Sequence, residues 1–148
     1  MSSEQNPGPE NRLGYLIKHA QLRHRELNDA ALAPYGIYGR ELGVLLAVAE
    51  GEPRSQQEVA ARLSIDRTTM VAMLDTLETK GVVIRSPDPD DRRRNVVAVT
   101  EAGAKLLVKA MRASDGVERA FLEPLDAQTA AAFRRALNVL TAPADPAR

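Results

Sequence analysis

The chain of 148 residues contains no cysteine, which excludes disulfide bonds, thiolate zinc sites and cysteine redox switches. Aromatic residues are also rare, at 3% of the chain, and tryptophan is absent. Alanine and leucine dominate the apolar residues, and this composition favours helices over a β-sandwich. A chain of this length fits one domain, or a compact core with helical extensions.

The sequence also lacks a net charge, because 20 Lys and Arg residues balance 20 Asp and Glu residues. Any attraction for nucleic acid must therefore come from local clusters of charge. The N-terminal segment MSSEQNPGPENR lacks the apolar core of a signal peptide, and no apolar run approaches the length of about 20 residues that spans a bilayer. We therefore expect a soluble, cytoplasmic protein that has no membrane partner.

The two ends of the chain have little apolar content. Residues 1–9 are rich in Ser, Glu, Gln, Asn, Gly and Pro, and residues 142–148 consist of Ala, Pro, Asp and Arg. Such segments cannot bury enough apolar surface to offset the entropy of ordering them. We expect a disordered tail over residues 1–9 and a frayed terminus over residues 142–148.

Two long helical regions, residues 10–35 and 101–141, flank the middle of the chain, and the first helix is predicted from Glu10 to Leu32. Apolar side chains recur there at steps of three and four, which places them on one helical face. The stripes are Leu13, Ile17, Ala20, His24, Leu27 and Ala31; Leu107, Ala110, Ser114, Val117 and Phe121; and Ala130, Phe133, Leu137 and Leu140. Long helices with such a seam often pack on a partner chain.

The middle of the chain, residues 36–100, begins with a shorter predicted helix from Gly39 to Ala49. The segment EGEP at residues 50–53 ends it with helix-breaking residues. The side chains expected to face inward are Leu42, Leu45, Leu46 and Ala49.

Two further short helices meet at a break over residues 63–65. Ser55 and Glu58 have the S-x-x-E spacing of a capping box, which marks the start of the first of them. Asp66 is a good N-cap for the second, and Gly81 is the residue expected just after its end.

Two β-rich segments, Val82–Arg85 and Asn95–Val99, follow the helix pair, and a loop of Pro, Asp and Arg joins them. Helix, turn, helix and hairpin form the outline of a winged helix-turn-helix. We therefore predict a mainly α fold with a small β wing. The winged helix-turn-helix region spans residues 36–100, between flanking helices at residues 10–35 and 101–141.

The outer face of the second helix of the pair starts with Arg67, Thr68 and Thr69 and continues through Ala72 and Thr76. In a helix-turn-helix, the first residues of the second helix meet base edges in the major groove. Threonine can bond to bases or phosphates, and its methyl group can touch a thymine methyl. The alternative is an ordinary solvated helix face.

The loop between the two β segments carries Asp91 followed by Arg92, Arg93 and Arg94. Three consecutive arginines cannot all point the same way, so at least one must extend from the tip. The narrow minor groove favours arginine through its negative potential. We expect one Asp to pair with one Arg and hold the loop, which leaves another Arg for DNA. The alternative is a surface loop that only aids solubility.

The segment from Leu63 to Gly103 resembles the MarR (multiple antibiotic resistance regulator) family of transcription factors. The resemblance is carried by D-P-x-D-R-R over residues 88–93, V-x-V-T-x-x-G over residues 97–103 and L-E-x-K-G over residues 77–81. It implies an obligate homodimer whose first and last helices interlock. Each protomer is then expected to bind half of a pseudopalindromic DNA site.

The resemblance also implies roles for individual residues. Arg67, Thr68 and Thr69 are placed at the major groove, and Arg92 or Arg93 in the minor groove. The implied role of Asp91 is to brace the wing; Ser55 and Gln56, at the start of the first helix of the pair, are expected at the DNA backbone.

One departure from the family concerns Ala72 and Thr76, which stand where many relatives carry longer basic residues. We expect fewer phosphate contacts from the middle of this helix, and partial compensation by Arg94, an extra basic residue in the wing. This hypothesis predicts that Arg93→Ala weakens DNA binding more than Thr76→Ala does.

Members of the family often bind small anionic aromatic effectors between the dimer helices and the winged domain. The candidates for such a site are Tyr15, His19, His24 and Tyr38. Ordinary packing roles compete with this interpretation, because His24 lies in the helical seam and Tyr38 can pack the connecting loop. A metal site is not expected, since His19 and His24 are five residues apart and lie off one helical face.

No Gly-rich phosphate loop, H-E-x-x-H motif or Ser/His/Asp arrangement is present, so we expect neither an enzyme nor a cofactor. The prediction is a sequence-specific DNA-binding transcriptional regulator, and repression is its expected output. A small-molecule ligand is expected to release it from DNA. The alternative function is a winged-helix module that binds protein and has no specific affinity for DNA.

Overall fold

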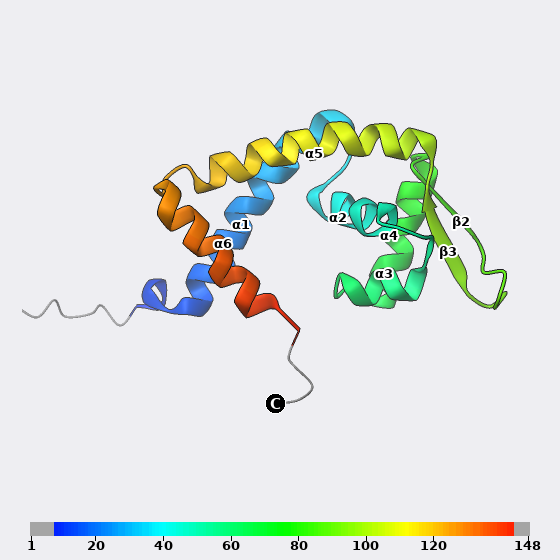
Figure 1. Cartoon of the computed structure of the whole chain (residues 1–148), viewed down its shortest axis with the longest axis horizontal. Helices are drawn as coiled ribbons and strands as arrows, with labels where there is room; N and C mark the ends of the chain where they lie inside the picture. Colours follow the sequence, from blue (N-terminus) through cyan, green and yellow to red (C-terminus); the bar gives the residue numbers. More distant parts are fainter. Residues whose placement is uncertain (1–7, 144–148) are drawn as a thin grey trace, which may run out of the picture.

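The computed structural model of the chain describes residues 8–143 (Figure 1). The helices are α1 (Leu13–Leu32), α2 (Gly39–Ala49), α3 (Gln56–Arg62), α4 (Arg67–Thr79), α5 (Glu101–Leu122) and α6 (Ala127–Thr141). The strands are β1 (Arg54–Ser55), β2 (Val83–Pro87) and β3 (Asn95–Val99), and the short 3-10 helices are η1 (Pro9–Asn11) and η2 (Ala33–Tyr35). This confirms the predicted mainly α fold with a small β wing. None of the helices in residues 8–143 is long and apolar enough to span a membrane.

The wing belongs to a three-stranded antiparallel sheet with the order β1-β3-β2. In the β2–β3 hairpin, Val83 pairs with Val99 and Pro87 pairs with Asn95. Strand β1 was not predicted, because its two residues are too few to show a period in the sequence. It pairs Arg54 with Val97, so the start of α3 is attached to the inner strand of the wing.

The core lies around α2, which packs against α1, α3, α5 and β3. Leu45 on α2 and Leu74 on α4 are fully buried. The predicted inward face of α2 is half wrong, because Leu46 is 40% exposed and Ala49 is also exposed. Neighbours on several sides give α2 a broad buried face. That face consists of Glu41, Leu42, Val44, Leu45, Ala47 and Val48.

Helix α5 runs from the sheet at one end to α6 at the other, and α1 packs along it (Figure 1). The end of the molecule away from the wing leaves much apolar surface uncovered. Leu13 on α1 is 72% exposed, and Leu140 on α6 is 76% exposed. No residue of α6 is buried. The predicted stripes on α6 and on the first turns of α1 are therefore largely exposed, whereas Leu107, Ala110 and Val117 of the α5 stripe are buried.

The predicted boundaries at the two ends are partly corrected. Residues 1–7 and 144–148 of the expected disordered tail and frayed terminus lie outside the described residues. Pro9, which was assigned to the tail, begins η1 instead. The first long helix begins at Leu13 rather than Glu10, because Arg12 adopts an extended conformation (φ −82°, ψ 136°) that separates η1 from α1.

Candidate nucleic-acid interface

Short polar caps start both helices of the helix-turn-helix. The Oγ atom of Ser55 accepts a hydrogen bond from the backbone N–H of Glu58 at 3.2 Å, which holds the first turn of α3. The Oδ1 atom of Asp66 accepts from the backbone N–H of Thr69 at 2.8 Å and starts α4. Both predicted N-caps are confirmed, and each satisfies an N–H group that would have no partner within its helix. Of the predicted capping box, only the bond to Ser55 Oγ is observed among the described residues.

Helix α4 presents Arg67 and Thr68 to solvent at its first turn. Thr69 is half-buried, and its hydroxyl donates to Oδ2 of Asp66 at 2.7 Å. Further along, the hydroxyl of Thr76 donates to the carbonyl oxygen of Ala72 at 3.1 Å. Both hydroxyl hydrogens are therefore engaged within α4, and the two oxygen atoms are left to act as acceptors.

The ionised form of the Asp66 carboxyl group is stabilised at the start of α4. Hydrogen bonds from the side chain and then the backbone N–H of Thr69 lower the pKa of Asp66 below its ordinary value. An anionic cap suits the positive end of the helix dipole. The charge also reduces the positive potential that the first turn of α4 offers to DNA, so basic residues nearby become more important.

The wing loop is organised around Asp91. The backbone N–H of Arg93 donates to Oδ1 of Asp91 at 3.1 Å, and the backbone N–H of Arg94 donates to its carbonyl oxygen at 2.9 Å. The Nε atoms of the same two arginines lie 3.6 and 3.7 Å from its carboxylate. Arg92 forms no ion pair with any residue in the described range. Asp91 thus holds the loop from inside, and the side chain of Arg93 remains 94% exposed.

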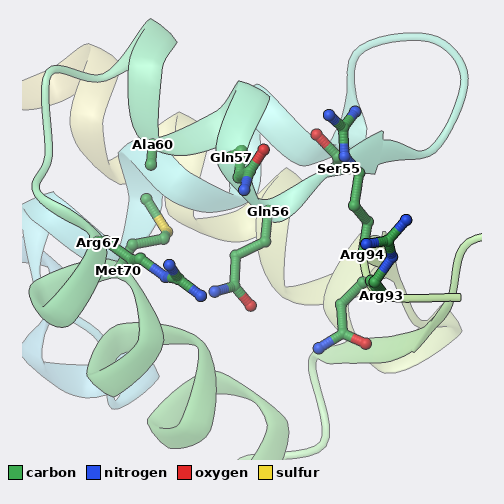
Figure 2. Close-up of a pocket in the computed structure, with 9 residues that line it drawn as sticks. Ser55, Gln56, Gln57, Ala60, Arg67, Met70, Arg93 and Arg94 are labelled. Carbon is green, nitrogen blue, oxygen red and sulfur yellow. The ribbon is translucent and has the colours of Figure 1, made fainter. Parts of the chain in front are cut away.

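A hollow of about 240 Å³ lies where the starts of α3 and α4 face the wing loop (Figure 2). It brings together five residues that the sequence indicated on three separate segments, namely Ser55, Gln56, Arg67, Arg93 and Arg94. Its other lining residues are Gln57, Ala60, Met70 and Asn95. Gln57 and Asn95 were not predicted to belong to the site, although Gln57 directly follows Gln56 and Asn95 directly follows the three arginines.

A second contact absent from the sequence predictions joins the wing to α4. Arg85 on β2 bonds through its guanidinium to Glu78 and Asp75, and its side chain is only 18% exposed. The hydrogen bond from the Arg85 side chain lowers the pKa of Glu78, and the same pairing raises the pKa of Arg85. The orientation of the wing relative to α4 is therefore defined by side chains as well as by the backbone.

The four candidate effector residues do not converge on one site. Tyr15 and His19 stack on each other with ring centroids 3.8 Å apart on the exposed half of α1. His24 meets Phe121 edge-on, with centroids 5.3 Å apart, beside a small hollow of about 170 Å³. Tyr38 alone lines a larger hollow, of about 370 Å³, next to α4.

The hollow beside Tyr38 lies where α1, the start of α2 and α4 meet. Its lining residues are Arg25, Asp29, Tyr38, Arg40, Glu41, Thr69, Ala72, Met73 and Thr76. It therefore combines two arginines, two carboxylates and an aromatic ring with the outer residues of α4. Within residues 8–143, no group of three or more His, Asp or Glu is arranged to hold a metal ion.

Comparison with known proteins agrees with this arrangement. A sequence model of the MarR family matches residues 35–94, which run from the connection before α2 to the wing tip. The transcriptional regulator HosA of Escherichia coli O111:H- is 31% identical over 112 residues, which are 75% of this chain and 77% of HosA. The chain belongs to the MarR family.

The chain is also similar to two proteins that are named as transcriptional repressors. The transcriptional repressor NicR of Pseudomonas putida is 30% identical over 64% of this chain, and the match spans only 60% of NicR. The repressor CouR, solved on a 23-mer DNA duplex, superposes with a TM-score of 0.83 at 32% identity, covering 88% of this chain and 93% of CouR. CouR of Rhodococcus jostii RHA1 was also solved with p-coumaroyl-CoA, with a TM-score of 0.81 at 28% identity over 95% of this chain and 99% of CouR.

Proposed function

We propose that this protein is a sequence-specific DNA-binding transcriptional regulator that represses by occupying a pseudopalindromic operator as a homodimer. The observation that carries the proposal is the hollow between α3, α4 and the wing loop, because it places Arg67 of α4 and two arginines of the wing loop against one surface. The role is one of binding rather than catalysis, and as a DNA-binding regulator the protein acts in the cytoplasm.

Helix α4 enters the major groove with its first turn, so that Arg67, Thr68 and Thr69 reach the base edges and adjacent phosphates. The wing then lies over the neighbouring minor groove, where Arg92 or Arg93 enters. The wing loop supports this placement, because Asp91 organises the backbone of the loop while the side chain of Arg93 stays 94% exposed.

The start of α3 lies at the DNA backbone, where Ser55 and Gln56 approach the phosphates. Both residues line the hollow that faces Arg67, which supports a common binding surface. The chain has no net charge, so this local cluster supplies the attraction that a generally basic protein would spread over its surface.

The homodimer is supported by apolar surface that the protomer leaves uncovered on α1 and α6. Leu13 and Leu140 are 72% and 76% exposed, and α6 buries none of its residues. Exposed apolar patches of this extent mark interaction surfaces. Interlocking of these helices would place the two α4 helices about 34 Å apart, or a multiple of this, to match successive turns of DNA.

Sedimentation velocity tests the dimer. The double substitution of Leu13→Asp and Leu140→Asp should convert the dimer to monomers, because it places charges in the apolar interface. Ile84→Asp is the matched control, because Ile84 is 55% exposed on β2, away from these helices. A monomeric wild-type protein at tens of micromolar would refute the dimer, and so would a double variant that remains dimeric.

The hollow beside Tyr38 is the proposed site for a small anionic aromatic effector. Arg25 pairs with Asp29 at 3.7 Å and Glu41 pairs with Lys80 at 2.8 Å, so Arg40, which forms no ion pair with any residue in the described range, supplies the positive charge. Tyr38 and Met73 supply an apolar surface. The same hollow touches α4 through Thr69, Ala72 and Thr76. An effector bound there releases DNA only if it binds the DNA-free arrangement of the dimer more tightly than the DNA-bound arrangement.

A panel of benzoates and hydroxycinnamates tests the effector by titration into a complex of the protein with fluorescent DNA. An active compound should lower the DNA affinity of the wild-type protein, and Tyr38→Ala should reduce its effect. Tyr15→Ala is the matched control, because Tyr15 lies on α1 outside this hollow. If no compound in the panel changes the DNA affinity, the proposed class of effector is wrong.

Selection of bound sequences from a random DNA duplex pool tests the main proposal. We expect an inverted repeat whose half-sites are spaced by one turn of DNA, together with weaker binding to unrelated DNA that falls steeply with salt. The absence of a mobility shift on any duplex, even at low salt, would overturn DNA binding. That result would favour a winged-helix module that binds protein.

A further inference from the structure

The hollow between α3, α4 and the wing loop has the size and the donor groups to hold one phosphate. A water molecule takes about 30 Å³ in the liquid, so a hollow of about 240 Å³ admits a phosphate group with part of its hydration. From these features we infer that Arg67, Arg94 and Gln56 clamp a single phosphate of the DNA backbone. The inference rests on the proposed DNA-binding function and specifies how one part of the surface is used.

The two arginines reach the hollow from different elements (Figure 2). Arg67 is the first residue of α4, and Arg94 is the last residue before β3. Arg67 forms no ion pair with any residue between positions 8 and 143, and Arg94 has only a loose contact of 3.7 Å between its Nε and Oδ2 of Asp91. Both guanidinium groups are therefore available for phosphate, which their planar forks bind through paired hydrogen bonds.

Gln56, which is half-buried, contributes a side-chain oxygen that lacks a partner. Its Oε1 atom is shielded from solvent and accepts no hydrogen bond within the described part of the chain. A buried polar atom without a partner costs free energy, so a ligand that engages this amide stabilises the bound form. Rotation of the amide exchanges its oxygen and its NH2 group, and the NH2 group can then donate to a phosphate oxygen.

The wing arginines then have separate tasks. Arg94 lies at the end of the wing loop, next to β3, where its carbonyl oxygen accepts from the N–H of Asp88 at 2.8 Å and closes the loop. Arg93 borders the hollow as well, but its side chain is 94% exposed and stays free to extend into the minor groove with Arg92. Arg94 therefore grips the backbone between the two grooves, beside the point where its neighbours enter the minor groove.

This assignment gives Arg67 a role that differs from base reading. Contacts to phosphate position a protein on DNA without selecting a sequence. The clamp then sets the register of α4 in the major groove, and sequence selection falls on the residues after Arg67. Arg67→Gln and Arg94→Gln are thus each expected to weaken binding to the operator and binding to unrelated duplexes by similar factors. Each should also reduce the slope of log affinity against log salt by about 1 per clamp.

Neutralisation of single phosphates tests the clamp. Methylphosphonate linkages are placed one at a time along each half of the selected operator, and affinity is measured by fluorescence anisotropy. The wild-type protein should lose affinity at least about tenfold at one position per half-site, as expected for a charged hydrogen bond. In Arg67→Gln and Arg94→Gln the same linkage should change affinity less than in the wild type, because one of the two arginines that contact this phosphate has already been removed.

Arg92→Gln is the matched control, because Arg92 carries the same charge in the same loop but does not line the hollow. This variant should keep the full sensitivity to the neutralised phosphate, and thermal unfolding should verify that all variants are folded. The clamp is refuted if the two clamp variants remain as sensitive as the wild type, or if Arg67→Gln weakens only operator binding. A protein that binds no duplex at all would refute the proposed function itself.

Discussion

The Nε atom of Arg85 on β2 lies 3.3 Å from Oε2 of Glu78 on α4, and the backbone N–H of Arg85 donates to the same oxygen at 3.1 Å. A second guanidinium nitrogen of Arg85 bonds to Asp75, about one helical turn earlier on α4. This contact anchors the wing strand β2 to α4. It also neutralises two carboxylates on a helix that is proposed to approach DNA phosphates.

Arg85→Met should weaken DNA binding while having a small effect on folding. The lost contacts are partly solvated, so we expect about 1 kcal/mol or less of the free energy of unfolding to be lost. The freed carboxylates of Asp75 and Glu78 should repel DNA, and the wing should lose its fixed angle. Hydroxyl-radical footprinting should therefore show reduced protection in the outer minor grooves.

Arg62→Met provides the control for Arg85→Met, because it breaks another exposed pair, between Arg62 and Glu50, that does not involve the wing. Its footprint should match that of the wild-type protein. Adding Asp75→Asn and Glu78→Gln to Arg85→Met should restore part of the affinity by removing the repulsion. Unchanged affinity and footprint in Arg85→Met would show that the contact does not orient the wing.

Gly103→Ala should destabilise the protein strongly. A Cβ atom at Gly103 would lie 2.1 Å from the carbonyl oxygen of Val82, so α5 would have to move away from the sheet. That movement would strain the hydrogen bond from Thr100 N–H to the same oxygen, which is 3.1 Å long. We expect a loss of about 3 kcal/mol, the upper end of the usual cost of overpacking, in urea unfolding.

Gly43→Ala is the matched control for Gly103→Ala, because Gly43 is also helical but has no atom within 4 Å of the position that a Cβ atom would take. It should stabilise the protein by up to about 1 kcal/mol through the higher helix propensity of alanine. If Gly103→Ala were as stable as the wild type, the close approach of α5 to Val82 would be wrong.

Arg93→Ala should weaken DNA binding more than Thr76→Ala does. The side chain of Arg93 is 94% exposed at the wing, whereas the hydroxyl of Thr76 already donates to the carbonyl oxygen of Ala72 at 3.1 Å. We expect a loss of about 1–3 kcal/mol for the arginine, as for a direct DNA contact, and a much smaller loss for the threonine. Anisotropy titrations on one duplex measure both, and comparable losses would contradict the prediction.

Acid should destabilise the protein through its capping carboxylates. Hydrogen bonds from Thr129 lower the pKa of Asp126 below the ordinary 3.8, and Asp66 is shifted the same way by Thr69. A lowered folded-state pKa adds stability that is fully present above the ordinary pKa and is lost as pH falls through the folded value. Urea unfolding should therefore show falling stability below about pH 4.

Thr129→Val tests the acid response at one cap. The hydroxyl of Thr129 donates to Oδ2 of Asp126 at 2.9 Å, and the substitution removes this bond while keeping the backbone bond. Its stability should fall less steeply between pH 5 and pH 2 than that of the wild type. An identical pH dependence in the two proteins would show that this cap does not contribute.

Local structure was determined by the sequence itself. The caps at Ser55 and Asp66 and the left-handed residue Gly81 (φ 77°) appear where the sequence placed them. Each depends on a hydrogen bond or a backbone preference that acts within about four residues, so a short segment contains all the information needed. The run of three arginines in the wing loop is likewise visible within a short segment of the sequence.

Contacts between distant segments were decided only by the tertiary structure. Leu46 was expected inside and is 40% exposed, because burial depends on which helices surround α2 and not on the α2 pattern alone. The packing of elements likewise decides three further features, namely strand β1, the hollow lined by Gln57 and Asn95, and the separation of Tyr15 from Tyr38. The sequence thus determined which groups could bind DNA. Packing decided which of them share one surface, because it sets the distances between residues far apart in the chain.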